Sequence, residues 1–287
     1  VLLQSVTPDR VAARMRTFLE NNGYFWTDVS YSVRQELNTA DIQYHIAVQS
    51  PYRINGITVT GGDTTIVDAI RSTMGETILA AGDQYDLAKL KQERERIDAA
   101  LKEKGYFYFS PDFIGFQADS SAGNKTVDLS LHVKKDIPVK ATRVYTIGNI
   151  YIFSGYSLNR DSITVPAGDT LSVDGCFYID LDDKFGPDAI VRSVFFRKGA
   201  LYSRSSHDLT LNRLMNLGVF KFLNVRFVDA DSAGIPRLEP HMYLTPLPTK
   251  NIRFELQGVS KSNNLAGPVL TSSFRNRNLF GGAELFT

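Results

Sequence analysis

Apolar residues recur along this chain at two different spacings, which alternate from segment to segment. A spacing of four, typical of one face of a helix, separates Ile97 from Leu101 just before a glycine. A period of two, typical of a strand with one buried face, runs through "DIQYHIAV" (residues 41–48) and "TVDLSLHV" (residues 126–133). The pattern therefore predicts helices that lead into strands, in an α+β fold.

The step from helix to strand occurs three times with the same residue types. A glycine ends each predicted helix and a phenylalanine follows two positions later, at Gly23 and Phe25, Gly105 and Phe107, and Gly218 and Phe220. Because glycine alone avoids the Cβ penalty of the left-handed conformation that closes a helix, we expect that conformation at these glycines. The three phenylalanines are predicted to be equivalent buried residues, each anchoring its own repeat.

The second and third repeats share two further features. A turn that reads Gly-x-x-Tyr separates two helices, at residues 82–85 and again at residues 199–202. Its distance from the helix-ending glycine differs by four residues between the copies, close to one helical turn. A strand precedes the helices in both, so the order of elements is β-α-α-β-β. The first repeat lacks this leading strand, because the chain begins almost at its helix.

These features predict four segments. They are residues 1–50, a repeat without its first strand; residues 51–138, a second repeat; residues 139–250, a third repeat with an insertion near 154–187; and residues 251–287. In the last segment, apolar Ile252, Phe254 and Leu256 alternate with polar neighbours. A strand that faces lipid on one side and a barrel lumen on the other has this alternation, and so does an amphipathic strand packed on a soluble core.

A β-α-α-β-β unit with the phrase helix-Gly-Tyr-Phe resembles the POTRA (polypeptide-transport-associated) domain. Such domains occur in series on the periplasmic side of outer-membrane assembly factors of the BamA and TamA kind. The stretch "NIRFELQGVSKSNNLAGPVLTSSFRNRNLFGGAELF" (residues 251–286) resembles the opening of the bacterial surface antigen barrel, with its Asn-Leu-Phe-Gly-Gly phrase at residues 278–282. The fold implied is a series of tandem POTRA repeats followed by the first strands of a transmembrane β-barrel.

The resemblance also implies a location and partners. The chain would be a periplasmic arm attached to the outer membrane of a Gram-negative bacterium through the remainder of the barrel. Its partners would be unfolded outer-membrane or secreted proteins and accessory periplasmic proteins. Three alternatives stay open: the arm of a two-partner-secretion transporter, a structural module that docks one fixed protein, and a surface hydrolase fused outside this sequence.

Composition and charge exclude several classes of function. Thirty-two Lys and Arg residues against 31 Asp and Glu residues leave a net charge of +1, which offers no electrostatic footprint for nucleic acid. Cys176 is the single cysteine, so no internal disulfide can form. The aromatic residues after the helix ends (Tyr24, Phe25, Tyr106 and Phe107) have a composition that a base-stacking surface would use, but a position after a helix cap favours packing in the core.

No arrangement of residues indicates catalysis, a cofactor or a metal. The four histidines lack the pairing of a zinc site, and neither a nucleophile-elbow nor a phosphate-loop motif is present. Four aspartates (Asp180, Asp182, Asp183 and Asp188) are spaced somewhat like a calcium loop. A glycine one position late, and a valine where a bidentate glutamate should stand, favour an ordinary solvated loop. We therefore predict a protein that is not an enzyme.

The candidate functional site is an unpaired strand edge. If the last two strands of each repeat form a hairpin, the strand after each Gly-x-Phe lies at an edge, at about 25–33, 107–117 and 220–228. An edge strand binds an extended segment through backbone hydrogen bonds, which tolerate many sequences. Pro111 is expected to interrupt the second edge. The third is the candidate client-binding strand, formed by Phe220, Lys221, Phe222, Leu223, Asn224, Val225, Arg226 and Phe227.

Overall fold

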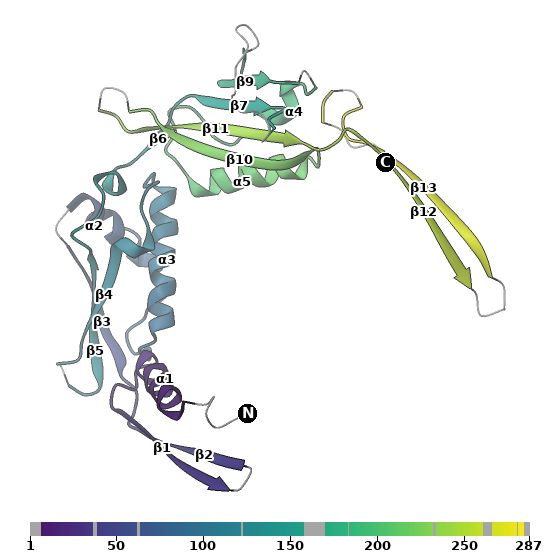
Figure 1. Ribbon diagram of the computed structural model, residues 1–287. Coiled ribbons are helices and arrows are strands. Elements are labelled where there is room, and N and C mark those ends of the chain that lie inside the picture. Colours follow the sequence, from purple (N-terminus) through teal and green to yellow (C-terminus); the bar gives the residue numbers. More distant parts are fainter. Residues whose placement is uncertain are drawn as a thin grey trace. The chain divides into compact units, whose positions relative to one another are not determined.

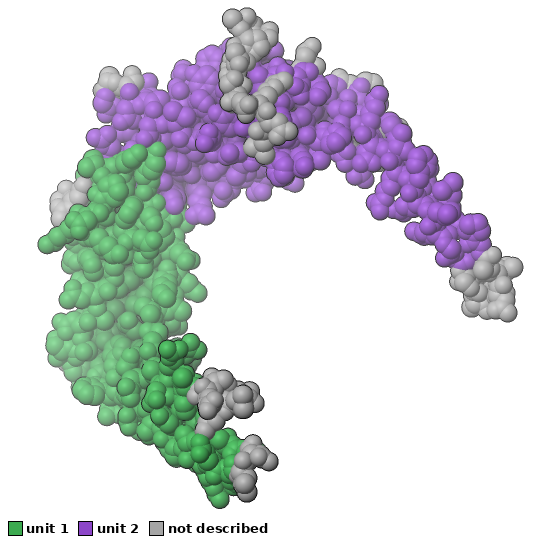
Figure 2. All heavy atoms as spheres, viewed as in Figure 1, with its two compact units in different colours: residues 1–101, 108–142 green, residues 102–107, 143–287 purple. Residues whose placement is uncertain are grey.

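The computed structural model describes residues 7–36, 39–61, 64–121, 123–157, 170–182, 184–231, 234–260, 266–279 and 281–283. The chain divides into two compact units, residues 1–101 with 108–142 and residues 102–107 with 143–287, which Figure 2 shows in green and purple. Among the described helices, none has both the length and the apolar character needed to cross a membrane.

The first repeat consists of one helix and a hairpin. Helix α1 (Pro8–Asn21) begins at a proline, which suits the first turn because no N–H is required there. Strands β1 (Thr27–Glu36) and β2 (Thr39–Val48) pair antiparallel along their whole length.

The second repeat is a three-stranded sheet with helices packed on it. The strand order is β3 (Arg53–Thr60), β5 (Thr126–Val133) and β4 (Ile114–Asp119), with β5 parallel to β3 and antiparallel to β4. Helix α2 (Thr64–Arg71), a 3-10 turn (Met74–Glu76) and helix α3 (Leu87–Glu103) lie between β3 and β4 in the chain.

Helix α3 buries an acidic residue among its apolar ones. Leu90, Ile97 and Leu101 face the core at helical spacing, and Glu93 on the same face is fully buried. Its carboxylate accepts two hydrogen bonds from Arg96 (2.9 and 2.7 Å) and one from the backbone N–H of Ile78 (3.1 Å). These three donors replace water, which is what a buried charge requires.

The third repeat is built on a larger sheet, whose strands lie side by side in Figure 1. The strand order is β10 (Phe220–Asp229), β11 (Arg237–Pro246), β7 (Ile150–Ser154), β9 (Cys176–Asp180) and β8 (Thr170–Val173), with β6 (Thr146–Ile147) also beside β11. The predicted insertion thus contributes two strands, β8 and β9, that widen the sheet. Helices α4 (Pro187–Val191) and α5 (Arg204–Asn216) cover it.

Helices α3 and α5, which follow the Gly-x-x-Tyr turn in the second and third repeats, differ in length by the amount that the turn spacing predicts. Helix α3 has 17 residues and α5 has 13, a difference of four. The apolar pattern of α5 has one exception, Thr210, which is fully buried. Its hydroxyl oxygen accepts the N–H of Phe195 (2.9 Å) and donates to the carbonyl of Ser206 (2.7 Å), so a threonine is accommodated there without an unpaired group.

The last described segment is a long hairpin, yellow in Figure 1. Strands β12 (Lys250–Ser260) and β13 (Ala266–Asn276) pair antiparallel over all eleven positions. Within the described part of the chain these strands pair only with each other, so no closed barrel is present.

All three helix-ending glycines adopt the left-handed conformation that the sequence pattern predicts. Their φ angles are +86° at Gly23, +90° at Gly105 and +68° at Gly218. At the first of them, the N–H of Tyr24 donates to the carbonyl of Leu19 (2.9 Å) and the N–H of Gly23 donates to that of Glu20 (3.0 Å). This is the double hydrogen bond of a Schellman cap.

The prediction that all three phenylalanines anchor their own repeats is wrong for two of them. Phe220 is buried, at 3% exposure, but Phe25 and Phe107 are only half-buried. The ring of Phe25 lies 4.9 Å from that of Tyr52, at the start of the following repeat. The ring of Phe107 likewise lies 4.8 Å from that of Tyr202. Both residues precede a strand and do not belong to it, so the sheet does not fix the direction of their side chains, which pack on tyrosines of the next repeat.

The predicted strand starts also need correction. The first edge strand begins at Thr27 instead of residue 25, and the second begins at Ile114 instead of residue 107. Pro111 opens a 3-10 turn (Pro111–Phe113) ahead of the strand, where Ser110 caps the N–H of Asp112. Pro111 therefore does not interrupt β4, contrary to the prediction.

Candidate functional site

Strand β10 lies at the open edge of the sheet in the third repeat. It pairs antiparallel with β11, from Phe222 opposite Thr245 to Asp229 opposite Leu238. No other strand of the described residues pairs with β10. The side of β10 that faces away from β11 therefore presents backbone groups without a partner strand.

Hydrogen bonds beyond the ends of the pairing show which backbone groups point outward. The N–H of Ala230 donates to the carbonyl of Arg237 (2.9 Å). The N–H and C=O groups of residues 222, 224, 226 and 228, which lie an even number of positions before Ala230, therefore also point toward β11. Hydrogen-bonded and non-hydrogen-bonded pairs alternate in an antiparallel ladder. The N–H and C=O groups of Leu223, Val225 and Phe227 therefore point away from β11, toward the open edge.

The other side of β11 agrees with this assignment. The carbonyls of Leu238 and Leu244 accept the N–H groups of Gly148 (2.8 Å) and Tyr156 (3.0 Å), which lie on the β7 side of β11. The backbone N–H and C=O groups of even-numbered residues of β11 thus point toward β7, and those of odd-numbered residues point toward β10.

The side chains of β10 form two different rows. Leu223, Val225 and Phe227 are half-buried on the face that carries α5, whereas Asn224 and Arg226 are exposed on the opposite face. On that exposed face, Phe222 and Val228 are 52% and 44% exposed. A strand added at this edge would thus have one set of its side chains beside the apolar row of Leu223, Val225 and Phe227, and the other set beside the exposed, mixed row.

An aromatic cluster fixes β10 against α5. The ring of Phe227 lies 5.1 Å from His207 on α5, 5.5 Å from Tyr202 and 4.8 Å from Phe107. Burial lowers the pKa of His207 below its usual value, which keeps the imidazole neutral among these rings at neutral pH. The edge strand is therefore packed against α5 on one face, while its backbone edge has no partner strand among the described residues.

The other predicted edges are present but differ in length. Strand β4, at the edge of the second sheet, has 6 residues, and β10 has 10. Strand β1 also has 10 residues, and it lies in a sheet of two strands. Because each added residue pair contributes hydrogen bonds, the longer edges offer more of them to an incoming strand.

Sequence reasoning missed a contact that recurs at two of the helix-ending glycines. The carbonyl of Gly23 accepts the N–H of Tyr52 (2.8 Å), and the carbonyl of Tyr52 accepts the N–H of Tyr85 (2.9 Å). The carbonyl of Gly105 accepts the N–H of Tyr145 (2.9 Å), whose own carbonyl accepts the N–H of Tyr202 (2.9 Å) in the same way. We call each set a glycine–tyrosine joint. Its signal in the sequence is the shared Gly-x-x-Tyr turn, which supplies the second tyrosine.

The aspartate cluster shapes a loop. The carboxylate of Asp180 accepts the N–H groups of Lys184 (2.7 Å) and Phe185 (2.8 Å), and Asp182 forms an ion pair with Lys184 (3.0 Å). Asp183 lies outside the described residues. Among the residues that the structure does describe, no group of three or more His, Cys, Asp or Glu side chains is placed to hold a metal ion.

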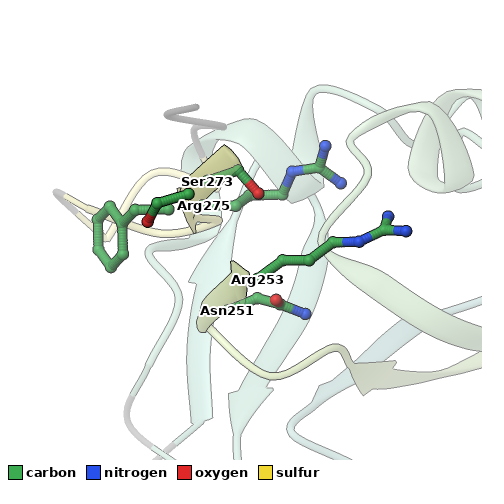
Figure 3. Close-up of a pocket in the computed structure, with 6 residues that line it drawn as sticks. Asn251, Arg253, Ser273 and Arg275 are labelled. Atoms are coloured by element: carbon green, nitrogen blue, oxygen red, sulfur yellow. The ribbon is translucent and has the colours of Figure 1, made fainter. Parts of the chain in front are cut away.

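A hollow of about 400 Å³ lies on the β12–β13 hairpin (Figure 3). The residues that line it are Asn251, Arg253, Ser272, Ser273, Phe274 and Arg275. The side chains of Arg253 and Arg275 extend to the same side of the hairpin in Figure 3. The lining includes the hydroxyls of Ser272 and Ser273 but no histidine, cysteine or carboxylate that could activate them, so we assign no chemistry to this hollow.

The face of the hairpin opposite Arg253 and Arg275 is apolar and exposed. Ile252, Phe254 and Leu256 are 62%, 70% and 76% exposed, and Leu270 opposite Leu256 is 68% exposed. Nothing in the described part of the chain covers this face. Large apolar side chains so open to water are unusual in a soluble protein and normally contact a partner or lipid.

The comparisons with known proteins concern the repeats. Residues 52–136 match the sequence profile of the POTRA family, described as a surface antigen variable number repeat. A comparison with curated proteins returns no match.

Among solved structures, BamA from Haemophilus ducreyi lacking POTRA domains 1–3 matches with a TM-score of 0.53 and 16% identity, over 81% of this chain and 36% of that one. BamA POTRA3-5 from Haemophilus influenzae matches with a TM-score of 0.45 and 15% identity, over 84% and 80% of the two chains. CdiB from Acinetobacter baumannii gives 0.36 and 11%, over 82% and 37%. The first of these three matches shows a shared fold.

Proposed function

Residues 52–136 form a POTRA domain, and on this premise we propose that the chain is the periplasmic arm of an outer-membrane assembly or translocation protein of the BamA kind. Its third repeat binds segments of unfolded outer-membrane or secreted proteins as an additional strand along β10. The arm works by binding alone, without a catalytic group or a cofactor of its own. The observation that carries this proposal is the open backbone edge of β10.

Three features of that edge suit a client that is unfolded and variable. The outward groups of Leu223, Val225 and Phe227 supply three N–H donors and three C=O acceptors, which pair with any extended backbone. The aromatic cluster behind the strand holds the edge in place, so little entropy is lost when a client pairs with it. Backbone pairing also carries no side-chain identity, so many clients share one site.

The β12–β13 hairpin supports the membrane half of the proposal. One face carries exposed Ile252, Phe254 and Leu256, and the other carries arginines, asparagine and serine. Such two-faced strands line the wall of an outer-membrane barrel, with the apolar row toward lipid. We therefore propose that residues 251–287 are the first strands of a barrel, which would hold the arm at the periplasmic face of the outer membrane.

A pair of proline substitutions tests the client site. Val225→Pro removes an outward N–H, and Asn224→Pro removes an N–H that bonds β11, because the two residues lie on alternate sides of the ladder. We expect Val225→Pro to fold and to bind an unfolded barrel segment at least about tenfold more weakly, since one backbone hydrogen bond is lost and the edge is distorted. Asn224→Pro should mainly lose stability.

Binding is measured by fluorescence anisotropy with a labelled, alternating apolar–polar barrel segment, and folding by circular dichroism. If Val225→Pro remains folded and binds as the parent does, clients do not dock on this strand. Binding of a folded periplasmic protein, but not of the unfolded segment, would instead identify a docking module with a fixed partner.

A further inference from the structure

The turn that follows β13 is bonded to the third repeat, far away in sequence. The side-chain amide of Asn278 donates to the carbonyl of Lys184 (2.6 Å), 94 residues earlier. The N–H of Gly186 donates to the carbonyl of Gly281 (2.7 Å). The two hydrogen bonds run in opposite directions between the same two segments, so each segment supplies a donor and an acceptor.

The loop of residues 184–186 is held in shape from within the third repeat. Asp180 accepts the N–H groups of Lys184 (2.7 Å) and Phe185 (2.8 Å), and the hydroxyl of Tyr178 donates to the carbonyl of Phe185 (2.7 Å). The side chain of Phe185 is buried, at 5% exposure, so the loop is anchored at its centre. The carbonyl of Lys184 and the N–H of Gly186, on either side of that anchor, are the two groups that reach the turn.

The turn is shaped independently by its own asparagines. The side-chain oxygen of Asn276 accepts the N–H of Asn278 (3.2 Å), and the side-chain oxygen of Asn278 accepts the N–H of Ala283 (3.0 Å). Asn276 and Ala283 are 4% and 7% exposed. The N–H of Arg277 also donates to the carbonyl of Thr249, just before β12 (2.8 Å). The turn therefore contacts the residue just before β12 as well as the loop of the third repeat.

We propose that the loop of residues 184–186 is an intramolecular receptor for the turn after β13, and that Asn278 is the residue that positions the two against each other. The insertion that widens the sheet of the third repeat would then have a role of its own, because it ends in this receptor. The receptor also touches the client edge, since the ring of Phe185 lies 5.5 Å from that of Phe220 at the start of β10. Only this last connection rests on the proposed function.

Two substitutions of Asn278 separate its contact with the loop from its contact within the turn. Asn278→Asp keeps an oxygen for the N–H of Ala283 but loses the donor to the carbonyl of Lys184, whereas Asn278→Ala loses both. Asn251→Ala is the matched control, because this exposed asparagine on β12 contacts neither segment in the described residues.

The measurement is hydrogen exchange of the Gly186 amide in the complete chain in detergent solution. We expect exchange to be at least about tenfold faster in both Asn278 variants, since the energy of one hydrogen bond corresponds to roughly that factor. Asn251→Ala should match the parent, and amides of β5 and β11 should be unchanged in all variants. Unchanged exchange of Gly186 in Asn278→Asp would overturn the receptor, because Asn278 would then act only within its own turn.

A variant on the receptor side completes the test. Asp180→Ala removes the acceptor that shapes the loop, so Gly186 should again exchange faster, and adding Asn278→Ala should have little further effect. Fully additive effects would show that the two residues act separately and would contradict the proposal. None of these measurements involves a client, so a failed client-binding experiment leaves the receptor standing, and the converse also holds.

Discussion

The three helix-ending glycines share a left-handed backbone but differ in what surrounds them. A Cβ added at Gly105 would lie 2.8 Å from a side-chain methyl of Val144 and 3.1 Å from the carbonyl oxygen of Tyr145. One added at Gly23 would lie 2.9 Å from the carbonyl oxygen of Tyr85, whereas at Gly218 no atom lies within 4 Å. Two of the glycines are therefore required for close approach as well as for their φ angle.

The comparison of Gly105→Ala with Gly218→Ala separates the two requirements. The left-handed conformation alone should cost each variant about 1–2 kcal/mol of stability, because the new residue carries a Cβ. Gly105→Ala should lose clearly more, because its methyl group also displaces the backbone of Tyr145. Urea denaturation measures both losses. Equal losses would show that the backbone of Tyr145 moves away from the added methyl group at no cost in folding free energy.

At this scale the sequence predicts the conformation but not the contact. A glycine between a helical pattern and a β-prone stretch is sufficient to indicate positive φ. The residue that approaches Gly105, however, is 40 positions further along the chain and belongs to another repeat, so local patterning carries no sign of it.

Whole elements were predictable where a single periodic pattern determines them. Strand β5 occupies residues 126–133, the stretch of strict alternation, and the four-residue difference between α3 and α5 follows from the turn spacing. The starts of β1 and β4 were not predictable from composition. Residues 106–113 are rich in aromatic side chains, which favour a strand. The strand begins only after them, because Pro111 opens a 3-10 turn capped by Ser110 and Phe107 packs on Tyr202.

Strand β10 is present from Phe220 to Asp229, close to the predicted range of 220–228. The direction of its backbone groups required the structure, because it depends on the register with β11, and a shift of that register by one residue exchanges the two sides. Its role in binding clients stays a prediction.

The packing of α5 on β10 predicts a dependence of stability on pH. Burial lowers the pKa of His207 in the folded chain, so between the unfolded value near 6.5 and the lower folded value only the unfolded chain takes up this proton. The stability that neutral His207 provides is thus present above about pH 6.5 and is lost as the pH falls through the folded pKa. His207→Leu removes the titrating group while keeping the apolar contact with Phe227.

The free energy of unfolding is measured by urea denaturation between pH 7.5 and pH 5. The parent should lose stability over this range, and His207→Leu should lose less. His45→Leu is the control, because His45 is an exposed residue on β2, and its pH dependence should match that of the parent. A parent and a His207→Leu variant with the same pH dependence would show that protonation of His207 does not oppose folding.

Across the whole molecule, two features that the sequence presents separately come together in one contact. The Gly-x-Phe step ends one repeat and the Gly-x-x-Tyr turn lies in the next, and the glycine–tyrosine joint combines them. Because such joints connect neighbouring repeats, the unfolding of one repeat is coupled to that of the next. Repeats that were each anchored only by their own phenylalanine would unfold independently. A single sequence shows that both features recur, but the pairing between them depends on tertiary contacts.

The joint of Gly23 predicts that one side chain stabilises two repeats. The ring of Phe25 packs on Tyr52 and Tyr85 at 4.9 and 5.0 Å, so Phe25→Ala should destabilise the first two repeats by about 2–3 kcal/mol, less than the loss for a fully buried ring. The amides of Tyr52 and Tyr85, which donate within the joint, should exchange faster, together with those of β1. Phe18→Ala is the matched control: Phe18 is 66% exposed on α1, so its loss should stay within about 0.5 kcal/mol. Faster exchange confined to residues 8–48 would mean that Phe25 supports its own repeat alone.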